Sequence, residues 1–236
     1  RDIGVTGVQT CALPIWCPQG YYLTERPNFS HDPHWHAGAY YVQEASSMFI
    51  DEIIRQIQLP PQKRMLDLCA APGGKSTLLA SHLHVDDVLV ANEVTPSRAN
   101  ILLENIVKWG SANVLVTQNQ AEDFKQLGAE FDFILVDAPC SGEGLFRKTP
   151  EAAGEWNMDN MRHCELRQQQ ILQQISGLVA QDGYIIYSTC TYNHHENIDN
   201  LVKFAQSNNF ESVQLDTSQF PQITVIEKCG FVGYGF

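Results

Sequence analysis

The chain has 236 residues, 44% of them hydrophobic, which is enough to bury one large core or two small ones. Acidic side chains outnumber basic ones by 27 to 15, giving a formal net charge of −12. This balance argues against a chain that holds nucleic acid by its own charge, because phosphate contacts need lysine and arginine.

The beginning of the sequence is read separately. The stretch VTGVQTCALPI (5–15) resembles the translation of a common sequencing-adapter oligonucleotide. We therefore interpret residues 1–15 as non-native and leave them out of the fold; the alternative is a genuine, irregular N-terminal arm. Residues 16–60 are then expected to form part of an extension that leads into a main domain over residues 61–236. No apolar run approaches membrane-spanning length and no signal peptide is recognisable, so we expect no membrane partner.

Helices are predicted where apolar residues recur at helical spacing. The first covers residues 43–58 and ends before Pro60 and Pro61. Another follows the loop at residues 70–76. A third begins at Pro96, capped by Thr95, and ends at Gly110. Its expected inward side chains are Ala99, Leu102, Leu103 and Ile106. A later helix carries Leu172, Ile175 and Val179, and a last one, capped by Asn193, carries Ile198, Leu201 and Ala205.

Apolar runs between these helices predict buried strands. They are residues 65–69, 88–93, 113–118, 131–138, 184–190 and 210–216. Strands that alternate with helices indicate an α/β fold with a doubly wound, mostly parallel sheet. Ligands of such sheets bind beyond the carboxyl ends of the strands. The polar residues that follow those ends are therefore the candidate site: Cys69 and its loop, Glu93, Asp137, Cys140 and Cys190.

The loop CAAPGGKST after the first strand resembles a P-loop but fails in detail. Cys69 stands where the first glycine should be, and Pro72 removes an amide that would face a phosphate. A glycine turn that precedes a helix, followed about 20 residues later by an acid at a strand end, suits an adenosine-type cofactor. Glu93 fills the acidic position; the alternative is a solvated charge at the end of a strand. The pattern alone does not choose between NAD and S-adenosylmethionine.

Seven cysteines are scattered without a paired C-x-x-C spacing, which argues against a zinc site and a disulfide framework and fits a reducing cytoplasm. Cys140 follows the predicted strand at 131–138 and Cys190 ends the neighbouring one at 184–190, so both should open on the same edge as the cofactor loop. They could be a redox pair, or a nucleophile and its helper. The histidines of HDPHWHAG (31–38) and NHHE (193–196) lack a complete ligand set, so we expect no metal.

The motifs YYVQEASS, LDLCAAPGGKS, ANE, DAPCSGEG, RKTP and YSTCTY occur in this order. Together they resemble the RNA cytosine-C5 methyltransferases of the Sun type, over residues 16–236. The resemblance implies a Rossmann-like domain that uses S-adenosylmethionine, an N-terminal extension and C-terminal RNA-binding modules. It also implies that this chain begins inside the extension and stops before the last sheet strand. The expected partner of this monomeric protein is RNA, namely small-subunit rRNA, with tRNA as the alternative.

The resemblance also implies roles for individual residues. Cys190 is the thiolate that adds to C6 of cytosine, Cys140 assists release of the adduct, and Asp137 holds the N3/N4 edge of the base. Lys75 faces the nucleotide and lowers a thiol pKa. The implied cofactor contacts are Cys69, Ala70, Ala71, Pro72, Gly73, Gly74, Lys75, Glu93 and Asp137. The family often has an aspartate after the third strand, where this sequence offers Asn119 or Gln120.

Three other functions are weighed. In a DNA cytosine-C5 methyltransferase a Pro-Cys after the fourth strand supplies the nucleophile, so Cys140 would attack and Cys190 would only pack; the STCT motif argues against this. A P-loop NTPase is opposed by Cys69 and Pro72. A non-catalytic RNA-binding scaffold is opposed by the presence of both cysteines.

Overall fold

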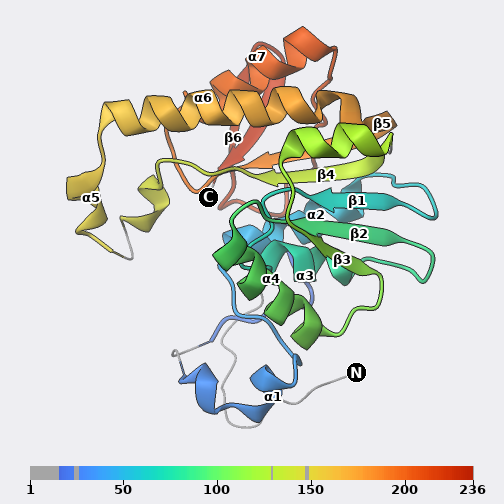
Figure 1. The fold of residues 1–236 in the computed structure, drawn as a ribbon. Helices are drawn as coiled ribbons and strands as arrows, with labels where there is room; N and C mark the ends of the chain where they lie inside the picture. The colour runs from blue at the N-terminus through green and yellow to red at the C-terminus, as the bar shows by residue number, and fades with distance from the viewer. Residues whose placement is uncertain (1–15, 24–26, 129, 147–148, 236) are drawn as a thin grey trace. The chain divides into compact units, whose positions relative to one another are not determined.

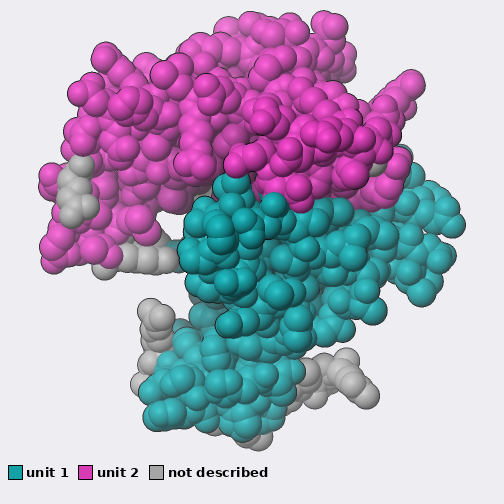
Figure 2. Space-filling model, viewed as in Figure 1, with its two compact units in different colours: residues 1–63, 70–118 teal, residues 64–69, 119–236 magenta. Residues whose placement is uncertain are grey.

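The computed structural model describes residues 16–23, 27–128, 130–146 and 149–235. Residues 1–15, which the sequence predicts to be non-native, lie outside the described part. The chain divides into two units, coloured separately in Figure 2. Unit 1 comprises residues 1–63 and 70–118, and unit 2 comprises residues 64–69 and 119–236.

Unit 1 alternates helices with two strands (Figure 1). Its elements are η1 (Phe29–His31), α1 (Pro33–His36), η2 (Ser46–Met48), α2 (Phe49–Gln56), α3 (Gly74–Ala80), β2 (Val88–Asn92), α4 (Pro96–Trp109) and β3 (Val114–Thr117). Strands β2 and β3 are parallel and pair from Leu89–Val114 to Asn92–Thr117. Helix α4 packs against β3, and its Leu102 and Ile106 are buried together with Ala91 of β2.

Helix α4 begins and ends as the sequence predicts. Thr95 is its N-cap residue, Pro96 opens the first turn, and Gly110 ends the helix in the left-handed conformation with φ 79°. The prediction that Leu103 faces inward is wrong, because this residue is 48% exposed. The buried stripe consists of Ala99, Leu102 and Ile106, and Leu103 lies about 100° around the helix from Leu102.

Unit 2 contains the other three parallel strands and the longest helix. Its elements are β1 (Arg64–Asp67), η3 (Ala121–Leu127), β4 (Phe131–Asp137), η4 (Glu143–Leu145), α5 (Ala152–Glu155), α6 (Met158–Ile175), η5 (Ser176–Leu178), β5 (Val179–Ser188), α7 (Ile198–Asn208), β6 (Thr224–Lys228) and β7 (Phe231–Gly235). Helices α6 and α7 lie side by side in Figure 1. Strand β4 pairs in parallel with β1 and with β5.

The parallel sheet has the strand order β3-β2-β1-β4-β5. The predicted α/β class with a parallel sheet is therefore confirmed. The side chains from Phe133 to Val136 of β4 are completely buried, as the continuous apolar run FDFILV predicts for a central strand. The order reverses between β1 and β4, and in folds of this type ligands bind at the carboxyl ends of the strands beside such a reversal.

Three sequence-based boundaries around the parallel sheet need correction. The predicted strand at 65–69 ends at Asp67, so Cys69 lies in a turn beyond β1. Strand β5 begins at Val179, which the sequence pattern placed on the preceding helix; that helix, α6, ends at Ile175. Strand β5 ends at Ser188, so Cys190 lies two residues beyond the strand rather than at its end.

The predicted strand at 210–216 is wrong, since no strand is assigned there among the described residues. Strands β6 and β7 pair instead in an antiparallel hairpin, with Lys228 opposite Phe231. The two residues between them, Cys229 and Gly230, have φ values of 53° and 82°. Positive φ at both positions is typical of the tight turns that join hairpin strands. The sequence pattern missed this turn because it lacks the common Asn-Gly or Asp-Gly pair.

Within the described ranges, every helix is too short or too polar to cross a lipid bilayer.

Candidate active site

Cys140 and Cys190 lie together beyond the carboxyl ends of two neighbouring strands. Asp137, the last residue of β4, pairs with Ser188, the last residue of β5, so the segments that follow leave the sheet at the same edge. The sulfur atoms of the two cysteines are 3.1 Å apart, within hydrogen-bond distance. The backbone N–H of Cys190 also donates to the Cys140 sulfur at 3.3 Å. The structure thus brings together the two thiols that the sequence singled out.

The two thiols have different environments. Cys190 is exposed, whereas Cys140 is half-buried. The hydrogen bond with the Cys190 thiol, burial and the negative charge of a Cys190 thiolate all raise the pKa of Cys140 above its ordinary value. The raised pKa disfavours the thiolate form of Cys140, and the Cys190 sulfur is the more accessible of the two.

The segments that carry the thiols are joined by backbone hydrogen bonds. Ala138 N–H donates to Ser188 O at 2.8 Å, and Gly144 N–H donates to Cys190 O at 2.7 Å. A Cβ atom at Gly144 would lie 2.6 Å from the Cys190 carbonyl oxygen, closer than side chains and backbone approach. Glycine is therefore required at position 144 for the segment to reach Cys190.

Glu143 binds the segment after Cys190, a role that the sequence analysis missed. Its carboxylate accepts hydrogen bonds from the backbone N–H groups of Tyr192 at 2.7 Å and Asn193 at 2.9 Å. Burial alone would raise the pKa of Glu143, but the hydrogen bonds from Tyr192, Thr191 and Asn193 lower it below its ordinary value. Its place beside Cys140 in the motif DAPCSGEG was the available signal.

Asp137 is also held in place at the end of β4. Its carboxylate accepts a hydrogen bond from the Ser188 hydroxyl at 2.7 Å. The side chain is half-buried, three residues before Cys140. A fixed acceptor at this position can bind a donor on a ligand that reaches the thiols.

In unit 1 the loop after β1 is tied to the end of β2. Ala70 N–H donates to Asn92 O at 2.8 Å. The Arg98 guanidinium donates to Ala71 O at 2.8 Å and also lies 3.2 Å from Glu93 Oε2. Arg98 therefore joins the glycine loop to the predicted ribose-binding acid, and no pattern in the sequence indicated it.

Glu93 is buried, with 2% of its surface exposed, so it is not the solvated charge of the alternative reading. Its Oε1 accepts a hydrogen bond from Thr95 N–H at 2.9 Å. Its Oε2 is buried and accepts no hydrogen bond, although the Arg98 guanidinium lies nearby. This oxygen is paired only with Arg98 and retains acceptor capacity for a ligand hydroxyl, so these residues fit a ribose-bearing cofactor.

The two glycines of the loop are favoured by a positive φ at Gly73 and by close neighbours at Gly74. Gly73, at the N-cap of α3, has φ 116°, and a Cβ there would lie 3.3 Å from the Leu102 side chain. A Cβ at Gly74 would lie 3.0 Å from Tyr41 Cε1 and 3.2 Å from Gln43 Oε1. The loop therefore lies against residues of the YYVQEASS motif, whose function was not apparent from the sequence.

The remaining predicted contacts have less specific surroundings. Cys69 is half-buried in the turn after β1, and Lys75 is the second residue of α3. Gln120 is the N-cap of η3: its side chain accepts from the Asp123 backbone, while its own N–H donates to the Asp123 carboxylate. Asn119 precedes this cap. Gln120 is therefore already engaged within the chain by its side chain and its backbone.

The histidine-bearing segments have structural roles. Asn193 Oδ1 accepts from Glu196 N–H at 2.9 Å, so NHHE forms a capped turn before α7, and Asn197 rather than Asn193 directly precedes that helix. Asp32 caps α1 by accepting from His34 N–H at 2.8 Å. In the described part of the chain, no three His, Cys, Asp or Glu side chains are grouped as a metal site would require.

Comparison with known families decides the classification. The family described as "16S rRNA methyltransferase RsmB/F" matches residues 55–230, about three quarters of the chain. The chain belongs to this family. The family described as "N-terminal domain of 16S rRNA methyltransferase RsmF" matches residues 8–45. The resemblance inferred from the motifs is thus confirmed.

Curated relatives and solved structures agree with membership of the RsmB/F family. Ribosomal RNA small subunit methyltransferase F of Aeromonas salmonicida is 37% identical over 196 residues, which cover 81% of this chain and 41% of that protein. The protein of the same name from Psychromonas ingrahamii is 38% identical, covering 80% and 40%. The chain thus spans about 40% of the length of these relatives.

Solved structures match the fold. A methyltransferase homologue from Pyrococcus horikoshii superimposes with a TM-score of 0.75 at 30% identity, covering 89% of this chain and 65% of that one. NSun6 from the same organism, solved with SFG, gives a TM-score of 0.72 at 27% identity, covering 84% and 50%. The Rossmann-like methyltransferase fold is therefore confirmed.

Proposed function

We propose that this chain is the catalytic part of an RNA cytosine-C5 methyltransferase that uses S-adenosylmethionine and acts on small-subunit rRNA. The observation that carries the proposal is the pair of thiols, 3.1 Å apart, with one exposed and one half-buried. Cytosine methylation at C5 through a covalent adduct needs a nucleophile and a second group that assists release, and the pair suits both roles. The names of the relatives support rRNA as the substrate.

The cofactor contacts are assigned to residues at the carboxyl ends of the strands. The loop from Cys69 to Lys75 and the buried Oε2 of Glu93 would hold the nucleoside part, with Asp137 and either Asn119 or Gln120 as further contacts. The relative solved with SFG, an analogue of S-adenosylmethionine, supports this choice over NAD. When bound, the cofactor supplies an electrophilic methyl group.

The nucleophile is assigned to Cys190. Its thiolate adds to C6 of cytosine, forming a C–S bond and moving the electrons of the C5–C6 double bond so that C5 becomes electron-rich. Exposure gives the sulfur access to a base, whereas the half-buried Cys140 retains its proton because its pKa is raised. Lys75 is assigned a place near the nucleotide, where its positive charge would favour the thiolate form.

Asp137 is assigned to the pyrimidine edge. Its carboxylate, held by the Ser188 hydroxyl, can accept a hydrogen bond from N4–H of cytosine, or from N3–H once N3 is protonated in the adduct. After methylation a base takes the C5 proton, the electron pair of the C5–H bond restores the C5–C6 double bond, and the C–S bond breaks so that Cys190 leaves as a thiolate. Cys140, beside the Cys190 sulfur, assists this release. The target base must be unpaired or leave its stack to reach the thiols.

The alternatives differ in the residue that attacks or in the substrate. A DNA-type mechanism would use Cys140, but burial and the raised pKa disfavour its thiolate. A tRNA substrate would use the same chemistry at another cytidine. A non-catalytic scaffold would need neither thiol, and nothing in the site favours it. A monomer acting in the cytoplasm, where rRNA is made in bacteria, is part of the proposal.

The function is tested by incubating small-subunit rRNA with the chain and S-adenosylmethionine and mapping 5-methylcytosine by bisulfite sequencing. We expect one cytidine to become resistant to deamination, and we expect the Cys229→Ala variant, which removes an exposed thiol in the β6–β7 turn, to give the same result. Methylation of tRNA instead would change the substrate class. Methylation at a position other than cytosine C5 would refute the proposal.

A further inference from the structure

Glu196 is a completely buried carboxylate between Cys190 and α7. Four hydrogen-bond donors surround it, two at each oxygen. Oε1 accepts from Ser141 N–H at 2.9 Å and from Gln168 Nε2 at 2.9 Å. Oε2 accepts from the Ser141 hydroxyl at 2.5 Å and from Asn193 Nδ2 at 2.7 Å. A carboxylate can be buried only when its acceptor capacity is met in this way.

The donors come from the two segments that carry the thiols. Ser141 directly follows Cys140, and Asn193 lies three residues after Cys190. Gln168 of α6 binds the Cys140 segment directly as well. Its Nε2 also donates to the carbonyl of Pro139, the residue before Cys140, at 2.9 Å. One carboxylate thus connects both sides of the thiol pair to the longest helix of unit 2.

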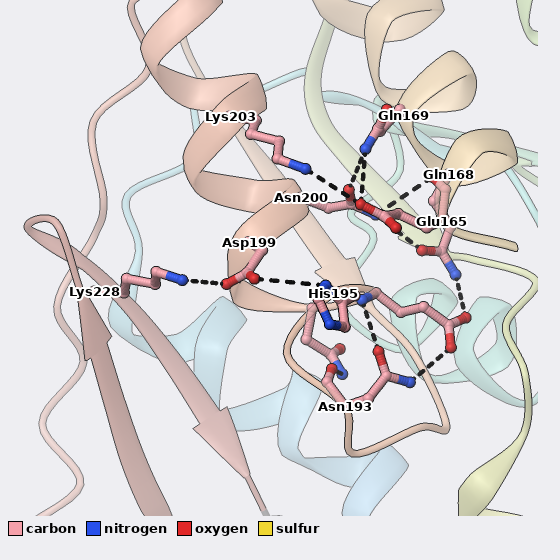
Figure 3. A network of polar contacts seen from close by, with 11 residues as sticks. Glu165, Gln168, Gln169, Asn193, His195, Asp199, Asn200, Lys203 and Lys228 are labelled. Atoms are coloured by element: carbon pink, nitrogen blue, oxygen red, sulfur yellow. Dashed lines mark hydrogen bonds and ion pairs between the residues drawn. The ribbon is translucent and has the colours of Figure 1, made fainter. Parts of the chain in front are cut away.

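The surrounding network fixes Gln168 in turn. Figure 3 shows Gln168, Asn200, Gln169 and Glu165 joined between α6 and α7, with Lys203 at the outer end. Gln168 Oε1 accepts from Asn200 Nδ2 at 3.0 Å, so the orientation of the Gln168 amide is set and its nitrogen must point toward Glu196. Asn193 is fixed likewise, since its Oδ1 already accepts from Glu196 N–H.

These fixed donors make an amide a poor substitute for the carboxylate. A glutamine at position 196 would turn its NH₂ group either toward Ser141 N–H and Gln168 Nε2, or toward the Ser141 hydroxyl and Asn193 Nδ2. In the first case two donors would face the NH₂ group, and in the second the Asn193 Nδ2 donor would, because the Ser141 hydroxyl can turn to accept. Either way the side chain at position 196 would lose at least one of its hydrogen bonds to the segments that carry the thiols.

We infer that Glu196 is a positioning residue that sets the distance and orientation between the Cys140 and Cys190 thiols. Its side chain is completely buried, so it acts through Ser141 and Asn193. The catalytic consequence rests on the proposed function, whereas the effect on the distance between the thiols does not.

The first test measures thiol proximity without methylation. The chain is treated with diamide, whose azo group takes up two electrons and two protons as Cys140 and Cys190 form a disulfide. The bond is then quantified by alkylation of the remaining thiols and mass spectrometry. We expect fast formation in the unmodified chain and formation slowed on the order of tenfold or more in Glu196→Gln, because small displacements of reacting groups cost up to ~10²-fold.

Glu165→Gln is the matched control, since Glu165 belongs to the same network but contacts Lys203 and Gln169 rather than either thiol segment. It should form the disulfide at the unmodified rate. Equal rates in Glu196→Gln and the unmodified chain, with both folded by circular dichroism, would overturn the inference.

If Glu196→Gln does not fold, Ser141→Ala replaces it as the test. This variant removes the hydroxyl donor to Glu196, together with the 3.2 Å contact of that hydroxyl with Thr191 Oγ1, and leaves the Ser141 N–H bond in place. We expect disulfide formation slowed several-fold, and an unchanged rate in a folded Ser141→Ala variant would equally overturn the inference.

The second test uses methyl-transfer kinetics. A positioning role predicts that Glu196→Gln lowers kcat by ~10²-fold while KM for S-adenosylmethionine and for RNA changes by less than about twofold. A rise in KM with unchanged kcat would contradict it. If the unmodified chain transfers no methyl group to cytidine, the proposed function fails, and the disulfide rates still decide the role of Glu196.

Discussion

Cys140 and Cys190 differ in how far each is removed from solvent. Cys190 is exposed and Cys140 is half-buried, with its pKa raised by the neighbouring thiol and by burial. A sequence pattern can bring two such residues to one edge of a sheet, but it cannot say which keeps its proton. The assignment of Cys190 as nucleophile, which the motif resemblance implied, gains physical support from this asymmetry.

A second feature at the residue scale is the buried Oε2 atom of Glu93, which accepts no hydrogen bond although Arg98 lies nearby. We expect Glu93→Ala to weaken the binding of S-adenosylmethionine by about 1.5–3 kcal/mol, because a charge-assisted hydrogen bond to the ribose would be lost. Isothermal titration calorimetry measures the change. Glu104→Ala, at an exposed position of α4, is the control and should bind normally. Unchanged affinity of Glu93→Ala, or tight binding of ATP, would contradict the assignment.

At the scale of elements, the segment after β4 depends on the absence of a side chain at position 144. We expect Gly144→Ala to destabilise the fold by about 1–3 kcal/mol, because its Cβ would lie 2.6 Å from the Cys190 carbonyl oxygen. Thermal unfolding measures the loss. Gly154→Ala is the matched control, since nothing lies within 4 Å of a Cβ there. Equal melting temperatures for the two variants would show that the close approach does not exist in solution.

We expect the stability of the fold to depend on pH through Glu143, which accepts hydrogen bonds from the segment after Cys190. Its pKa is lower in the folded chain than the ordinary value of 4.5, so the unfolded chain binds more protons in this range. The stabilisation is complete above about pH 4.5 and is lost as the pH falls through the folded-state pKa. The melting temperatures of the unmodified chain and Glu143→Gln should therefore differ at pH 7 and converge in acid. A difference that is constant from pH 7 to pH 3 would contradict this.

Sequence patterns predicted elements well where local chemistry is strong. Helix α4 has a proline at its start and a glycine at its end, and strand β4 is a continuous apolar run, so both were placed within a residue. The hairpin of β6 and β7 was missed because its turn uses Cys229 and Gly230. The strand predicted at 210–216 failed because alternation over a few residues does not provide a pairing partner.

The site could be predicted only in part, because local sequence patterns do not encode long-range contacts. Motif residues identified both thiols, Asp137 and Glu93. Arg98 and Glu196 were missed, because their importance depends on contacts that no local pattern encodes. Glu196 lies in the stretch NHHE, which the sequence predicted to cap a helix and which forms a turn before α7 instead. The burial of Glu196 against Ser141 becomes visible only in the folded chain.

At the scale of the whole molecule, the net charge of −12 is unfavourable for the proposed RNA substrate, whose phosphates are also negative. Non-specific affinity for RNA comes mainly from lysine and arginine contacts that release counterions. We therefore expect the chain to bind non-cognate RNA with a Kd of ~10⁻⁴ M or weaker at about 0.15 M salt, with a shallow salt dependence. Fluorescence anisotropy measures both. Tight, steeply salt-dependent binding would show a basic surface that the net charge conceals.

The most direct test of the covalent mechanism compares two variants on a denaturing gel. Each is incubated with S-adenosylmethionine and small-subunit rRNA. Without Cys190 no adduct can form, so Cys190→Ala should give neither 5-methylcytosine nor trapped RNA. Without Cys140 the attack and methyl transfer proceed but release stalls, so Cys140→Ala should accumulate a covalent protein–RNA band. Trapping by Cys190→Ala and no adduct with Cys140→Ala would reverse the two roles, and methylation unaffected by either change would show that neither thiol is catalytic.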